Sequence, residues 1–366
     1  MKIVGSRIRG NRTGCADPQC IAGVAAVAAY DEDGAPAESL GFDDSLVTGN
    51  ASSCLAEGCT SAGILALDAL SVELEETAVE GNLVDCQGAS CTAGAQLDVR
   101  AGYVVLEELS LASATTGCEG DACAIRNALQ IATPGVATLV DSRIAGVTAS
   151  CEGAGCSVGG LAEVKALAPL VEAVEVSAST LSCVGQGCST GPLADVEGTE
   201  LSRWQHVRIL DNQATCSGVE CHTGDFLELS SDEAIVIEGS TIAANVSACE
   251  GERCDARRIV ELQEAEAVQL QTSSIAGNAV RCAGEKCRLE PLVEMVAEKS
   301  VGIAASALDA NVSSCEGAQC RAEVVLAVDA ELASIDGGRI ATNGSQCDGT
   351  SCTVGFGGRC ATTPAR

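Results

Sequence analysis

Paired cysteines carry the clearest chemistry in this sequence. Of its 23 cysteines, all but Cys360 stand in pairs with four residues between the partners. Two thiols at this spacing can close a six-residue disulfide ring, and disulfides persist in oxidising compartments. The pairs are Cys15 and Cys20, Cys54 and Cys59, Cys86 and Cys91, Cys118 and Cys123, Cys151 and Cys156, Cys183 and Cys188, Cys216 and Cys221, Cys249 and Cys254, Cys282 and Cys287, Cys315 and Cys320, and Cys347 and Cys352.

The spacing leaves three interpretations of the pairs open. We expect each pair to form its own disulfide, which removes about 2 kcal/mol of unfolded-state entropy. Disulfides between neighbouring copies are the second, because strands about 4.8 Å apart also satisfy disulfide geometry. The third is a set of zinc or iron–sulfur sites with four thiolates from two pairs, although eleven pairs would leave one over. Cys360 is expected on the inward face of a strand, as a buried free thiol.

A row of carboxylates is the second candidate for chemistry. Its members recur once in each of five successive copies and alternate with apolar residues, which places them on the outer face of a strand. Calcium prefers oxygen ligands, so Ca²⁺ is the one cofactor this row could bind. Otherwise the row is a solvated face, since like charges about 4.8 Å apart repel by only about 1 kcal/mol in water. The row is Glu163, Asp195, Glu228, Glu261 and Glu294.

Residues suited to catalysis are scarce. The sequence contains two histidines, His206 and His222, and one tryptophan, Trp204. The segment from Trp204 to His222 is therefore the one place where an enzyme or lectin acting on polysaccharide could have a specialised site. Because the rest of the array is uniform, we expect no catalytic residue and a protein that is not an enzyme.

A repeat must position these residues. The steps between the first cysteines of successive pairs are 39, 32, 32, 33, 32, 33, 33, 33, 33 and 32. A fixed period along a whole chain indicates one repeat domain, here residues 1–366. The long first step predicts a longer loop near residues 30–39, and neither end has an obvious cap.

Within each copy the apolar residues have a period of two. Residues 72–75, Val-Glu-Leu-Glu, are one example, and such alternation predicts a strand with one buried face. Each copy offers three short strands, so the sequence predicts an all-β parallel β-helix, or solenoid, of about eleven coils. Stacked ladders of Ile, Val and Leu would fill its core, which accounts for an aromatic content of only 2%.

An asparagine stands four residues before the first cysteine in most copies. Stacked side-chain amides can bond their neighbours above and below, and asparagine tolerates the left-handed backbone of tight turns. We expect a buried asparagine ladder. Its members are Asn11, Asn50, Asn82, Asn212, Asn245, Asn278, Asn311 and Asn343, with Ala114, Val147 and Ser179 at the exceptions.

Three segments carry a family resemblance. Residues 240–245, 273–278 and 306–311 read STIAAN, SSIAGN and SALDAN. They resemble the S-x-I-x-G-N repeat of right-handed parallel β-helix proteins on bacterial surfaces, which are polymorphic outer-membrane-protein-like or adhesin-like. The resemblance implies a right-handed coil and exposure at a cell surface. The Cys-x₄-Cys loop is an addition to that pattern.

Composition narrows the function classes. The net charge of −30 opposes binding to nucleic-acid phosphates, and no apolar run is long enough for membrane insertion. We expect an extracellular or cell-surface structural protein: a stalk, an adhesin segment or a self-assembling fibre subunit. Its partners would be its own copies, head to tail through open ends, or a surface glycan or protein. The alternatives are a polysaccharide-binding or polysaccharide-cleaving β-helix and a divalent-cation-binding matrix protein.

Overall fold

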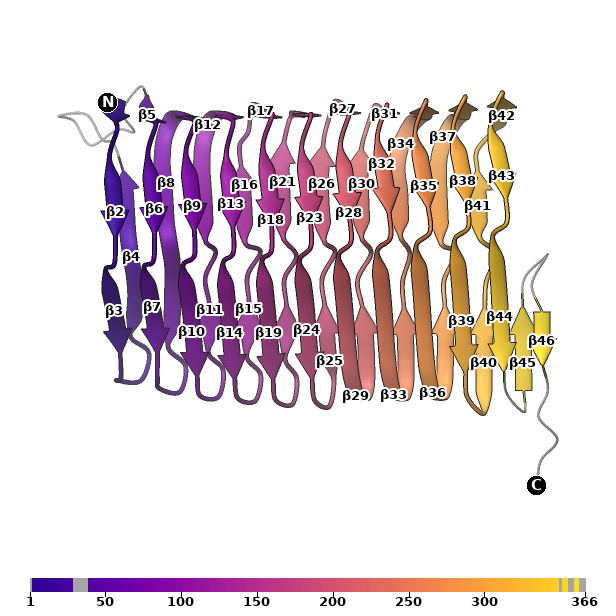
Figure 1. Ribbon diagram of the computed structural model, residues 1–366, viewed down its shortest axis with the longest axis horizontal. Coiled ribbons are helices and arrows are strands. Elements are labelled where there is room, and N and C mark those ends of the chain that lie inside the picture. The colour runs from indigo at the N-terminus through magenta and orange to yellow at the C-terminus, as the bar shows by residue number, and fades with distance from the viewer. Residues whose placement is uncertain (1, 29–38, 349–350, 355–358, 362–366) are drawn as a thin grey trace.

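The protein is an all-β parallel solenoid, as the repeat predicts (Figure 1). The computed structural model describes residues 2–28, 39–348, 351–354 and 359–361. The predicted long loop near residues 30–39 lies almost entirely outside them. We number the coils 1–11 by their cysteine pairs, so coil 7 contains Cys216. Every pairing between neighbouring strands in the described residues is parallel, and equivalent residues of successive coils face each other, as Val176, Ile209 and Ile242 do.

One sheet takes a single strand from each of the eleven coils in the described residues. Its strands are only three residues long, and the middle residue is the apolar one that points inward. They are β2 (Arg7–Arg9), β6 (Leu46–Thr48), β9 (Ala78–Glu80), β13 (Ser110–Ala112), β18 (Arg143–Ala145), β23 (Glu175–Ser177), β28 (Arg208–Leu210), β32 (Thr241–Ala243), β35 (Ser274–Ala276), β38 (Ala307–Asp309) and β43 (Arg339–Ala341).

The remaining strands form a second, 35-stranded sheet that wraps around the coil. Strands preceding the short sheet are β1 (Lys2–Val4), β5 (Leu40–Asp43), β17 (Val136–Val140), β22 (Ala168–Glu172), β27 (Leu201–Gln205), β31 (Ala234–Glu238) and β42 (Leu332–Asp336). Strands carrying the first cysteine are β3 (Arg12–Cys15), β7 (Ala51–Cys54), β10 (Leu83–Gln87), β14 (Thr115–Glu119), β19 (Thr148–Glu152), β24 (Thr180–Val184), β39 (Val312–Glu316) and β44 (Gly344–Asp348).

Two further strand positions follow the cysteine loop, so a coil has more strands than the three expected. At or just after the second cysteine lie β11 (Thr92–Ala93), β15 (Ala124–Ile125), β20 (Ser157–Val158), β25 (Cys188–Thr190), β40 (Gln319–Ala322) and β45 (Ser351–Val354). The next position holds β16 (Leu129–Ala132), β21 (Ala162–Ala166), β26 (Ala194–Gly198), β30 (Leu227–Ser231) and β41 (Leu326–Asp329).

Some strands run through two positions without a break, and one of them runs through three. They are β4 (Ile21–Ala28), β8 (Thr60–Glu75), β12 (Leu97–Glu107), β29 (Gln213–Thr223), β33 (Val246–Ala256), β34 (Val260–Gln271), β36 (Ala279–Leu289) and β37 (Val293–Ala304). Figure 1 shows the result as a rod with its coils side by side and the cysteine loops aligned along the lower edge. The interior is one continuous cluster of buried aliphatic and cysteine side chains.

A single left-handed residue makes the corner on each side of the short sheet. The residue before each asparagine position has a positive φ in all eleven coils, as Gly49, Ala244 and Gly277 do. Ten positions before each first cysteine, the other corner repeats the conformation, with His206 and Gly239 among its members. The left-handed residue is thus the neighbour of the asparagine and not the asparagine itself, which keeps the amide free to point inward.

The asparagines form a hydrogen-bonded ladder that is buried except at its two ends, where Asn11 is exposed and Asn343 is partly buried. The backbone N–H and the Nδ2–H of Asn245 both donate to Oδ1 of Asn278, at 3.1 and 3.0 Å. Nδ2 of Asn278 in turn donates to Oδ1 of Asn311 and to the carbonyl oxygen of Ile242, both at 2.9 Å. At one of the exceptions, the hydroxyl of Ser179 accepts from a neighbouring N–H and so takes part of the role of the amide.

The last described strand departs from the prediction for Cys360. In sequence, Cys360 follows Cys347 as Val328 follows Cys315, which would place Cys360 on the strand position of Val328. Instead β46 (Arg359–Ala361) pairs with β44, and Cys360 lies opposite Cys347. The predicted register was therefore wrong: β46 extends the ladder of the first-cysteine strands and does not continue the rank of Val328.

Candidate functional site

Nine cysteine pairs are joined as disulfides within their own loops. In the joined pairs the two Cα atoms lie 5.7–6.1 Å apart, within the range that a disulfide spans. The strands on either side of the loop bring the two cysteines together at the narrow edge of the coil. The joined pairs are Cys15–Cys20, Cys54–Cys59, Cys86–Cys91, Cys118–Cys123, Cys151–Cys156, Cys183–Cys188, Cys216–Cys221, Cys249–Cys254 and Cys315–Cys320.

The pair in coil 9 differs from this expectation. Cys282 and Cys287 are buried thiols in hydrogen-bond contact with each other, which together with burial raises the pKa of Cys282. Their backbone register matches the joined pairs on both sides, so the difference is confined to the two side chains. The side chain of Cys352, the expected partner of Cys347, lies outside the described residues.

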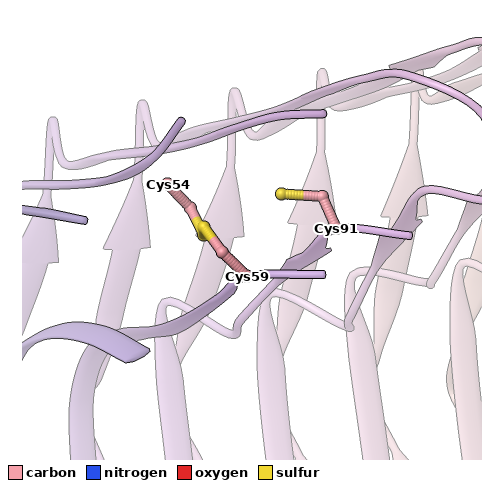
Figure 2. Close-up of side chains that lie close together, drawn as sticks. All are labelled: Cys54, Cys59 and Cys91. Atoms are coloured by element: carbon pink, nitrogen blue, oxygen red, sulfur yellow. A yellow bond between two sulfur atoms is a disulfide. The ribbon is translucent and has the colours of Figure 1, made fainter. Parts of the chain in front are cut away.

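In these nine loops the structure shows neither disulfides between neighbouring coils nor thiolate metal sites. Figure 2 shows Cys54 and Cys59 joined to each other while Cys91 of the next coil lies beside them. Their sulfur atoms lie within 4.8 Å of one another, the kind of spacing that a thiolate metal site needs. Because Cys54 and Cys59 share a bond, they are not thiolates and cannot act as metal ligands.

The predicted carboxylate row exists as a register but not as one uniform site. Glu163, Asp195, Glu228, Glu261 and Glu294 face one another in sequence across β21, β26, β30, β34 and β37. At one end, Nδ2 of Asn127 and Nε2 of Gln130 donate to Glu163 at 2.5 and 3.0 Å. Lys165 adds an ion pair to Glu163 at 3.3 Å. Protein groups therefore already satisfy this carboxylate.

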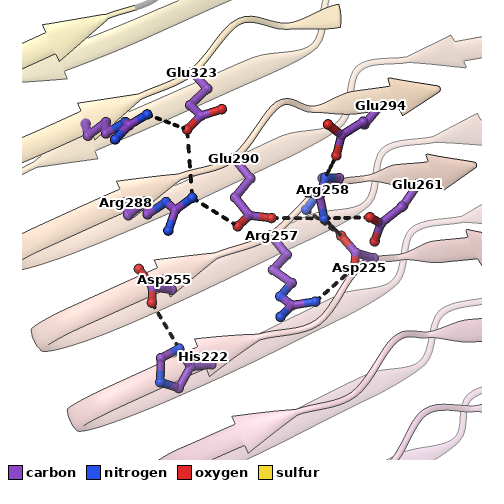
Figure 3. A network of polar contacts seen from close by, with 11 residues as sticks. His222, Asp225, Asp255, Arg257, Arg258, Glu261, Arg288, Glu290, Glu294 and Glu323 are labelled. Carbon is purple, nitrogen blue, oxygen red and sulfur yellow. Dashed lines mark hydrogen bonds and ion pairs between the residues drawn. The ribbon is translucent and has the colours of Figure 1, made fainter. Parts of the chain in front are cut away.

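Arginine interrupts the other end of the row. Arg258 lies where the chain passes from β33 to β34, and its side chain is mostly buried, with 15% of it exposed. It pairs with Glu261 at 3.0 Å and with Glu290 and Glu294 of the next coil at 2.9 and 2.5 Å (Figure 3). Glu294 is thus bound to a cation of the protein itself.

Asp225 is the member of this cluster that the sequence analysis missed. It lies between β29 and β30, its side chain is 1% exposed, and its Oδ1 accepts the backbone N–H of Arg258 at 2.7 Å. Burial, and next the negative charge of Glu261, raise its pKa to about 8. Oxygen atoms of Asp225, Glu228 and Glu261 all lie within 4.8 Å of one another. The signal available in the sequence was an aspartate before Phe226, where the preceding coils have Pro192 and Gly160.

The segment from Trp204 to His222 does not assemble a specialised site. Trp204 is 3% exposed and packs in the core, and His206 occupies a left-handed corner. His222 lies on the outer surface 3.3 Å from Asp255. Among the described aromatic residues only Tyr103 is exposed, at 62%, so these residues provide no row of aromatic platforms for sugars.

Comparisons with known proteins add no relative. No family model, no curated protein and no solved structure matches this chain. The described residues also contain no helix that could cross a membrane. The functional argument therefore depends on the geometry of the chain itself.

Proposed function

We propose that this protein is an extracellular structural rod without catalytic activity. The observation that carries the proposal is the uniformity of the coils: the same buried ranks, left-handed corners and cysteine loops recur along the chain. A polymer of equivalent coils has no single place that is set apart for a reaction. Eleven coils at the usual strand spacing make a rod about 50 Å long, and the disulfides favour an oxidising compartment such as a cell surface.

End-to-end contact between copies is part of the same proposal. The first described coil carries four cations, Lys2, Arg7, Arg9 and Arg12, against one carboxylate, Asp17. The last described turn, from Asp329 onward, carries Asp329, Glu331, Asp336 and Asp348 against two cations, Arg339 and Arg359, and leaves Leu332 and Ile335 more than half exposed. Opposite charges around apolar strand edges favour a head-to-tail stack of copies.

Electron microscopy of the unreduced protein across a concentration series tests the proposal. We expect rods of the length of a single chain at low concentration and longer rods of the same width at high concentration. A compact particle, or reproducible cleavage of a polysaccharide by the purified protein, would overturn the structural role. Rods that keep one length at every concentration would remove the head-to-tail part alone.

A basic groove supports a second candidate, binding of an anionic glycan. The groove has a volume of about 460 Å³ and runs beside the second cysteines of coils 8–10. Four cations line it, Arg253, Lys286, Arg288 and Arg321, together with one carboxylate, Asp255. This concentration of cations is unusual in a chain of net charge −30. The test is retention on a sulfated polysaccharide resin, where we expect Lys286→Ala with Arg288→Ala to elute at lower salt. Equal elution of the variant and the wild type would eliminate this candidate.

A further inference from the structure

The surroundings of Asp225 leave a buried carboxylate oxygen without a hydrogen bond. Oδ2 of Asp225 makes no hydrogen bond, although the side chain is almost completely buried. Arg257 and Arg258 approach Asp225 only to 3.9 Å, whereas Arg258 lies within 3.0 Å of three glutamates. Arg258 is therefore engaged mainly by the glutamates, and half-exposed Arg257 gives Oδ2 only a long ion pair, while carboxylate oxygens of Glu228 and Glu261 lie within 4.8 Å of Asp225.

The charges around this oxygen do not balance. Removing an ionised carboxylate from water is costly unless a cation or hydrogen-bond donors compensate it. When all groups are ionised, the place holds two more negative charges than positive ones. Five carboxylates and three guanidinium groups meet there: Asp225, Glu228, Glu261, Glu290 and Glu294, with Arg257, Arg258 and Arg288.

We propose that Asp225, Glu228 and Glu261 bind one Ca²⁺ ion that links coils 7 and 8. Calcium binds oxygen ligands at about 2.3–2.6 Å, so two oxygens on one ion are at most about 5 Å apart, as the three carboxylates here already are. An all-oxygen donor set favours calcium or magnesium over zinc. Glu228 is only partly buried, so water can complete the coordination shell. The site does not depend on the rod function.

The same row predicts where calcium does not bind. Glu163 is held by Asn127, Gln130 and Lys165, and neither Glu163 nor Glu294 belongs to the group of three carboxylates whose oxygens lie within 4.8 Å of one another. One ion per chain is therefore expected, in contrast to an ion between every pair of coils. Glu163 also provides a matched control, since it occupies the same rank on an equivalent strand.

Isothermal titration of the full-length protein with CaCl₂, after removal of metals with EDTA, tests the proposal. We expect one Ca²⁺ per chain, weaker binding of Mg²⁺, and at least a tenfold loss of Ca²⁺ affinity in Asp225→Asn and Glu261→Gln. Glu163→Gln should bind as the wild type does. Circular dichroism melts show whether each variant is folded, and Ca²⁺ should raise the Tm of the wild type and of Glu163→Gln only.

Three results would overturn the proposal. The first is no Ca²⁺ binding by the wild type at millimolar concentration. The second is unchanged binding in a folded Asp225→Asn variant. The third is a stoichiometry of several ions per chain that falls equally in Glu163→Gln, which would mean that calcium binds weakly along the whole acidic face.

Discussion

The asparagine ladder yields the sharpest prediction: Asn278→Ala should destabilise the rod strongly. Asn278 lies in the middle of the longest uninterrupted run of the ladder, and its side chain is buried. The amide makes four hydrogen bonds, accepting two from Asn245 and donating one each to Ile242 and Asn311. Alanine removes all four.

The magnitude follows from the groups left behind. The backbone N–H of Asn245, one of its Nδ2 hydrogens and the carbonyl oxygen of Ile242 lose their partner. Oδ1 of Asn311 keeps one, because the backbone N–H of residue 278 still donates to it at 3.1 Å. Three unpaired buried groups at roughly 1–3 kcal/mol each give a loss of about 3–9 kcal/mol. Alanine leaves room for a water molecule, so the lower part of this range is expected.

Denaturant unfolding measures the loss, and hydrogen exchange locates it. Asn343→Ala is the matched control: it ends the described ladder, is partly exposed and should cost only about 1 kcal/mol. In Asn278→Ala the amide of Asn245 should exchange faster, whereas the amide of Asn311 should keep its protection because it donates to Asn343. A loss below about 1 kcal/mol with an unchanged exchange rate at Asn245 would refute the ladder argument.

Three further predictions concern the glycines, one disulfide and the buried carboxylate. Gly284→Ala places a Cβ 1.7 Å from a carbonyl oxygen of the preceding coil and should lower the free energy of unfolding by about 3 kcal/mol or more. Gly277→Ala, where nothing lies within 4 Å of the added Cβ, should cost only about 1–2 kcal/mol because of its positive φ. Denaturant unfolding measures both losses. Replacing Cys216 and Cys221 together by alanine should lower the unfolding free energy by about 2 kcal/mol under non-reducing conditions, and alkylation followed by mass spectrometry should then count one disulfide fewer; an unchanged count would contradict the pairing. In EDTA, the free energy of unfolding should fall as the pH rises from about 4 to 8, because folded Asp225 keeps a proton that the unfolded chain releases. Asp225→Asn should lose this part of the dependence of the unfolding free energy on pH. An equal dependence in both proteins would contradict the raised pKa of Asp225.

Many features of the fold are visible in the sequence because neighbouring coils repeat them. A residue type that recurs once per coil stacks on its own equivalents, so Val176, Ile209 and Ile242 identify a core rank without any structure. The asparagine rank is readable for the same reason, since only mutual hydrogen bonding explains a repeated buried amide. The short strands beside the cysteine loops were missed because so few residues show too little alternation to be recognised.

Features that occur once could not be read in this way. Asp225 and Arg258 hold equivalent positions in coils 7 and 8, and nothing in their spacing shows that one backbone N–H binds the other side chain. Cys360 repeats the spacing of Val328 from the first cysteine of its coil, and only the pairing of β46 with β44 showed that it lies opposite Cys347.

The sequence by itself therefore determined the coil: its length, its core ranks and its asparagine ladder. It left the pairing partners of the cysteines open, and the structure decided nine of them. A period constrains all copies at once, so a single arrangement must satisfy them together. The tertiary structure decided where the uniform row of carboxylates becomes a buried cluster that differs from the rest of the row. That depends on which side chains from two neighbouring coils share one buried volume, and on whether their charges cancel there.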